Sequence, residues 1–153
     1  MRTISIFGEQ VASMNALLSI EPEFAEKILD GEKQYEFRRT AFRDPSAVEK
    51  VILYASSPVQ LIIGFFSIGD VIEDTPQKLW NRYGSESGIN RRERFMDYFS
   101  GKATGYAIEI EDTVQFQTPV NPWEHLDDFY PPMSFNYVNS EFDFLLKAPK
   151  IDN

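Results

Sequence analysis

The segment Gly31-Glu32-Lys33-Gln34-Tyr35-Glu36-Phe37-Arg38 joins a predicted helix to a predicted strand. The helix spans residues 22–30, and Gly31 suits the left-handed backbone position that ends many helices. Beyond it, side chains alternate between the two faces of the strand. We expect Tyr35 and Phe37 to face the core. The opposite face then carries the polar side chains of Gln34, Glu36 and Arg38, with Lys33 beside them at the turn.

Two interpretations of this polar face remain open on the residues alone. Lys33, Glu36 and Arg38 are three ionisable groups at one helix-to-strand turn, so they could form a single site. They could equally be the solvated side of a half-buried strand. A surface ion pair of that kind contributes only ~0–1 kcal/mol to stability.

The spacing Gly-x-Lys-x-x-Glu-x-Arg after a short helix resembles the signature of the ASCH family, a branch of the PUA-like superfamily. Further segments resemble other parts of the same pattern, and together they cover about residues 16–138: Ala16–Ile20, Tyr54–Pro58, Ile62–Phe66 and Pro131–Phe135. The resemblance implies an α+β fold, a PUA-like mixed β pseudo-barrel with short flanking helices.

The chain of 153 residues has the length of one ordinary domain. We expect residues 1–15 to be an N-terminal arm or an added strand, and residues 16–153 to form a single ASCH/PUA-like domain. The pattern predicts helices at 22–30, 76–83 and 89–99, and strands at 17–20, 34–38, 48–55, 61–73, 104–116, 134–137 and 142–146.

Composition narrows the chemistry that the chain can perform. It contains no cysteine and one histidine, His125, so disulfides and the common zinc sites are excluded. No spaced acidic motif or phosphate-binding glycine loop is present, and we expect neither a metal ion nor an organic cofactor. No run approaches the length of a membrane span and no secretory signal is evident, so we expect a cytoplasmic protein without a membrane partner.

Charge is unevenly distributed along the chain. The net charge of −9 argues against indiscriminate binding of nucleic acid, because phosphate contacts supply most of that affinity. Two arginine clusters could still hold an anion locally: Arg38, Arg39 and Arg43, and Arg82, Arg91, Arg92 and Arg94. By contrast, residues 109–143 contain eight acids and no lysine or arginine.

The first functional hypothesis is an RNA- or nucleoside-binding module, with a modified base as one possible ligand and regulation of transcription or translation as its role. Cationic side chains would hold a phosphate or a base edge, and Glu36 would accept a hydrogen bond from a donor such as an amino group. The predicted ligand-binding residues are Lys33, Glu36, Arg38, Arg39, Ser56, Ser134 and Phe135. Candidate stacking aromatics, for which core packing is the alternative, are Trp80, Tyr83, Trp123, Phe129 and Phe135.

Two other hypotheses belong to different classes. The resemblance implies a hydrolase as the first: an amidohydrolase acting on a modified cytidine-type nucleoside, or a ribonuclease, using Lys33 with Glu36 or Glu86. One enzyme branch of the family carries threonine where this chain has Glu36, which weakens the amidohydrolase variant. The other hypothesis is a protein–protein module that uses the acidic 109–143 segment. The sequence leaves the oligomeric state open.

Overall fold

A computed structural model describes residues 3–6, 9–12 and 14–151 of the chain, with side chains from residue 14 onward. The strands in these residues are β1 (Thr3–Ile6), β2 (Glu9–Ala12), β3 (Met14–Ile20), β4 (Tyr35–Arg38), β5 (Val48–Ala55), β6 (Leu61–Asp74), β7 (Gly105–Val120) and β8 (Phe135–Val138). The α-helices are α1 (Pro22–Leu29), α2 (Pro76–Tyr83) and α3 (Arg92–Tyr98). Short 3-10 helices are η1 (Pro45–Ala47), η2 (Gly84–Glu86), η3 (Pro122–Glu124) and η4 (Ser140–Lys147).

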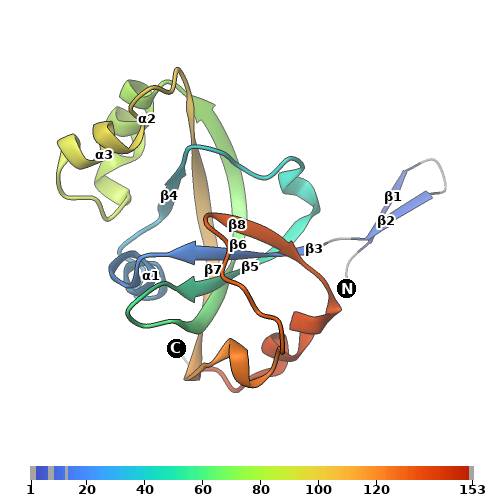
Figure 1. Ribbon diagram of the computed structural model, residues 1–153. Helices are drawn as coiled ribbons and strands as arrows, with labels where there is room; N and C mark the ends of the chain where they lie inside the picture. Colours follow the sequence, from blue (N-terminus) through green and yellow to red (C-terminus); the bar gives the residue numbers. More distant parts are fainter. Residues whose placement is uncertain (1–2, 7–8, 13, 152–153) are drawn as a thin grey trace.

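Six of the described strands form one curled sheet in the order β4-β7-β6-β5-β3-β8 (Figure 1). Strands β3 and β5 run parallel, and every other neighbouring pair is antiparallel. The molecule is therefore an α+β protein with a mixed sheet and short helices, and this confirms the predicted PUA-like pseudo-barrel class.

The N-terminal residues form a sheet of their own. Strands β1 and β2 pair antiparallel, with Thr3 opposite Ala12, and this pair is separate from the six-stranded sheet. Residues 1–2, 7–8 and 13 lie outside the described part of the chain. The division into an arm at 1–15 and a domain at 16–153 stays a prediction.

Apolar side chains fill both faces of the sheet. Helix α1 buries Ala25 and Ile28 against one face, and η4 buries Leu145 against another cluster that includes Phe116. Helices α2 and α3 pack around Phe37 at one end of the long β6–β7 ribbon, while the orange-red C-terminal segment lies at the other end (Figure 1). The short strand β4 therefore has helices α2 and α3 on its aromatic side.

Sequence patterns located most elements within a few residues, with two instructive exceptions. The predicted strand at 142–146 is wrong, because these residues lie in η4, which begins after a cap in which Asn139 Oδ1 accepts the N–H of Glu141. A short apolar run fits a buried strand and a buried helical turn equally well. Strand β7 continues past residue 116 to Val120, because Val120 still pairs with Ile62 of β6.

Replacing Gly64 with alanine is expected to destabilise the fold by about 1–3 kcal/mol or more. A Cβ at this position in β6 would lie 2.2 Å from the Val114 carbonyl oxygen of β7, so the sheet backbone would have to move. Gly69→Ala in the same strand is the matched control. Its Cβ would meet the carboxylate ends of Glu109 and Glu111, which can rotate away. Urea unfolding followed by circular dichroism measures the free energy of unfolding of both variants. An equal decrease for Gly64→Ala and Gly69→Ala would show that the contact with the Val114 backbone is not the cause.

Candidate functional site

Lys33 is buried immediately after the helix-ending turn. Gly31 adopts φ +86°, and the backbone N–H of Lys33 then donates to the Lys27 carbonyl at 2.9 Å. The lysine side chain is 1% exposed. Its ammonium group donates to the Ser87 carbonyl and lies 3.1 Å from Glu36 Oε1. This environment holds the charge through a carboxylate and a backbone dipole.

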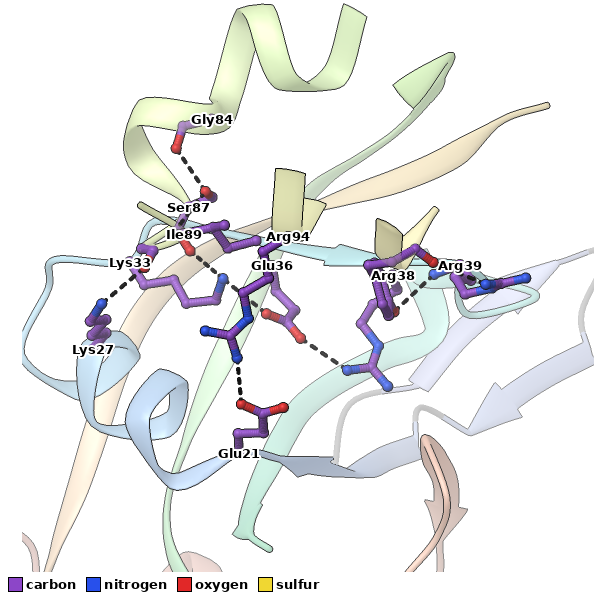
Figure 2. Close-up of polar contacts among 12 residues, drawn as sticks. Glu21, Lys27, Lys33, Glu36, Arg38, Arg39, Gly84, Ser87, Ile89 and Arg94 are labelled. Atoms are coloured by element: carbon purple, nitrogen blue, oxygen red, sulfur yellow. Dashed lines mark hydrogen bonds and ion pairs between the residues drawn. The ribbon is translucent and has the colours of Figure 1, made fainter. Parts of the chain in front are cut away.

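Glu36 connects Lys33 to Arg38 through its two carboxylate oxygens (Figure 2). Arg38 Nη1 donates to Glu36 Oε2 at 3.0 Å, and Arg38 Nη2 donates to Ser134 Oγ at 2.6 Å. The Glu36 side chain is 6% exposed and that of Arg38 is 13% exposed. The three ionisable groups are thus a buried charge chain, and the interpretation as a solvated strand face is wrong.

The charge chain borders a pocket of about 540 Å³. The start of α1, the β5–β6 turn, helix α3 and the loop before β8 surround the Lys33–Glu36–Arg38 chain. The other lining residues are Ser19, Ile20, Glu21, Phe24, Phe37, Tyr54, Ser56, Ser57, Gln60, Ile89, Arg94, Tyr98, Pro131, Pro132 and Met133. We call this cavity the charged pocket, because three cations and two carboxylates line it.

Ser56 lines the charged pocket, as a ligand-binding role requires. Ser134 contributes through its hydrogen bond from Arg38, and its carbonyl accepts the N–H of Ser19. One donor of the Arg38 guanidinium, the buried Nε–H, has no acceptor among the described residues. Unsatisfied buried donors are rare in native proteins and call for an explanation.

Four predicted site residues do not line the charged pocket: Ser134, which contacts Arg38, and Arg39, Phe135 and Glu86. Arg39 is exposed, and its guanidinium and backbone N–H bond to Tyr98, so it braces a lining residue. The Phe135 ring packs on Phe42 with centroids 4.7 Å apart. Glu86 is exposed on η2. Partial burial raises the pKa of Tyr35, and the carboxylates of Glu109 and Glu86 add to that rise.

The aromatic residues of the charged pocket differ from those that the sequence suggested. None of Trp80, Tyr83, Trp123, Phe129 and Phe135 lines it. Its aromatic lining consists instead of Phe24, Phe37, Tyr54 and Tyr98. Burial raises the pKa of both tyrosine hydroxyls, so they are protonated donors at neutral pH.

The two arginine clusters contribute one member each. Arg38 and Arg94 line the charged pocket, and the other five arginines of these clusters do not. A protein of net charge −9 thus places three cations and two carboxylates at one concave site, where low-dielectric walls strengthen the local field.

A second cavity, of about 550 Å³, lies in the acidic 109–143 region. Asp127, Asp128 and Glu141 line it together with His125, whose ring stacks on Phe144 with centroids 4.7 Å apart. Its charge is opposite to that of the pocket around Arg38. The acidic protein–protein module stays a prediction.

Two properties of the described residues bear on the predicted partners. No helix within them is long and apolar enough to cross a membrane. No group of three or more His, Cys, Asp or Glu within them is placed to hold a metal ion.

Comparison with known proteins agrees with the signature and the fold. The family model for the ASCH domain matches residues 18–127. An ASCH domain-containing ribonuclease of Zymomonas mobilis is 31% identical over 131 residues, covering 82% of this chain and 85% of that protein. The crystal structure of ASCH from Zymomonas mobilis has a TM-score of 0.77 at 29% identity, covering 90% of this chain and 96% of that one.

A more distant structure shares the fold alone. The N-terminal domain of McrB from Staphylothermus marinus has a TM-score of 0.57 at 11% identity, covering 90% of this chain and 95% of that one. The family match spans most of the chain and includes the buried charge chain. This protein belongs to the ASCH domain family.

Proposed function

We propose that this chain binds single-stranded RNA in the charged pocket and cleaves it. The observation that carries the proposal is the Lys33–Glu36–Arg38 chain beside a cavity of about 540 Å³. Cations held in a poorly solvated concavity are well suited to bind a phosphate. The similarity to a protein named as a ribonuclease supports cleavage rather than binding alone.

The size and charge of the site favour a single strand over a duplex. Ligand pockets typically measure about 300–1,000 Å³, and a nucleotide enters such a pocket only when its base is unstacked. A net charge of −9 disfavours the many phosphate contacts by which proteins hold a duplex. A few cations at one cavity suit one nucleotide of a flexible strand.

The geometry suggests a role for each charged residue. Arg38 and Lys33 stabilise negative charge that develops on the phosphate. Glu36 uses both oxygens on these cations and therefore acts as a positioning residue. RNA brings its own nucleophile: the 2′-oxygen bonds to phosphorus, the P–O5′ bond breaks, and the proton lost from the 2′-hydroxyl is balanced by the one that the 5′-oxygen gains.

Binding without cleavage is the second candidate, as an RNA- or nucleoside-binding regulator. The favouring observation is that Glu36 and Lys33 are fully engaged with each other, Arg38 and the Ser87 carbonyl, which leaves neither group free as a base. The nucleoside amidohydrolase has less support, because Glu86 lies outside the charged pocket.

Single-stranded RNA is expected to be cut to products that end in a 2′,3′-cyclic phosphate, whereas the same sequence in duplex form is expected to resist. Substituting 2′-deoxynucleotides throughout should abolish cleavage, because the attacking oxygen is gone. Denaturing gels of labelled oligonucleotides measure cleavage, and mass spectrometry of the products identifies their ends. Salt-sensitive binding without cleavage would favour the second candidate, and absence of binding at low salt would contradict both.

A further inference from the structure

Arg94, a lining residue of the charged pocket, reaches from α3 to Glu21 at the start of α1 (Figure 2). Its Nη2 donates to Glu21 Oε2 at 2.7 Å, and its Nη1 lies 3.7 Å from Glu23 Oε2. Two carboxylates therefore occupy one edge of the guanidinium. They balance its charge, and the hydrogen bond to Glu21 holds one end of the guanidinium.

The same guanidinium lies next to an aromatic ring. Arg94 Cζ lies 4.7 Å from the centroid of the Phe24 ring, which also lines the charged pocket. The arginine side chain is nevertheless 48% exposed. Although acids lie near its Nη atoms and Phe24 lies beside its Cζ, the Arg94 side chain therefore keeps exposed surface that a ligand in the charged pocket can reach.

We propose that the exposed guanidinium of Arg94 is a stacking platform for a base of single-stranded RNA, next to the nucleotide that the charged pocket holds. The inference rests on the RNA binding proposed above. Guanidinium planes stack on unpaired bases, and a preorganised plane loses little entropy when it does so. Because Nη2 of Arg94 already donates to Glu21, the contribution of the guanidinium is a surface for the base and not a phosphate contact.

Replacing Arg94 with lysine keeps the charge and removes the plane. The probe is a short single-stranded RNA with 2′-fluoro groups throughout, which cannot be cut through a 2′-oxygen. R94K is expected to weaken its binding by about 5- to 150-fold, the range for loss of one stacked base. An RNA that lacks the base at the stacked position should bind the wild type more weakly by a similar factor. R94K should bind that RNA no more weakly than it binds the intact RNA. The slope of affinity against salt should stay unchanged, because no phosphate contact is lost.

A second variant and a spectroscopic signal separate stacking from loss of structure. Phe24→Leu removes the ring beside the guanidinium and should lose binding at the same base position. A 2-aminopurine at that position should be quenched by the wild type and not by either variant. Arg92→Lys, on the same helix but outside the pocket, is the control and should bind like the wild type.

The outcomes distinguish the platform from the proposed function. If the wild type binds the RNA but removal of each base weakens wild type and R94K equally, the stacking platform is overturned and the proposed RNA binding stands. Full affinity of R94K for the intact oligonucleotide also overturns it. A wild-type protein that binds no RNA overturns both.

Discussion

Replacing Lys33 with methionine is expected to lower the free energy of unfolding by about 3–5 kcal/mol. Methionine preserves much of the volume but removes a cation that is 1% exposed and lies 3.1 Å from a carboxylate that is itself 6% exposed. Glu36 would keep Arg38 as a partner, which limits the loss, but the Ser87 carbonyl would lose its ammonium donor. Urea denaturation followed by circular dichroism measures the change, with an unchanged slope against denaturant expected.

Lys27 provides a matched control for the Lys33 variant. It also lies against Phe24 and donates to a loop carbonyl, that of Gly88 at 2.9 Å, but its carboxylate partner Glu23 is 52% exposed. Lys27→Met should therefore cost about 1 kcal/mol or less. The double variant Lys33→Met with Glu36→Gln should lose less than the sum of its single changes, because each removes the same interaction. An equal decrease in the free energy of unfolding for the two lysine variants would show that burial of the ion pair does not determine its contribution to stability.

The signature strand shows how far local sequence determines a site. Alternation along β4 correctly placed Phe37 among the aromatic residues around α3, and Glu36 and Arg38 on the opposite face. This works because a strand repeats every two residues whatever surrounds it. The helix end at Gly31 followed equally from backbone conformation.

The burial of the charged side chains could not be predicted from local sequence. Lys33 is buried because the Ser87 carbonyl, 54 residues further on, meets its ammonium group, and Arg38 is held by Ser134, 96 residues further on. Such contacts depend on how the sheet curls and on which loops meet at its edge. No periodicity within the 31–38 segment carries that information.

The aromatic lining was unpredictable for the same reason. Phe24 has the helical spacing of a core residue and does pack against the core, but its partly buried ring also lines the charged pocket beside Arg94. Tyr98 enters the pocket with α3, where Arg39 holds its hydroxyl. Conversely, Phe135 belongs to the Pro131–Phe135 segment that resembles a family element, but its ring packs on Phe42. Sequence identifies which side chains are aromatic, whereas tertiary packing decides which of them a ligand meets.

Replacing Arg38 with lysine is expected to lower kcat/KM for RNA cleavage by about 10²–10³-fold, comparable to the loss of one preorganised donor at a transition state. Lysine keeps the positive charge but cannot reproduce the planar geometry by which Nη1 meets Glu36 at 3.0 Å and Nη2 meets Ser134 at 2.6 Å. Single-turnover rates with saturating enzyme measure the chemical step, and equilibrium binding to uncleavable 2′-fluoro RNA measures affinity. We expect the rate to fall much more than the affinity.

Two further variants test whether this loss belongs to the charged pocket. Arg82→Lys changes an exposed arginine of α2 that lies over Tyr83 outside the pocket, and should cleave like the wild type. Ser134→Ala removes the hydroxyl that holds Arg38 Nη2 and should lower the rate less than Arg38→Lys, because the contact with Glu36 remains. A parallel fall in rate and affinity for Arg38→Lys would instead make Arg38 a uniform binding residue, since a contact equally strong in ground and transition states does not accelerate the chemical step.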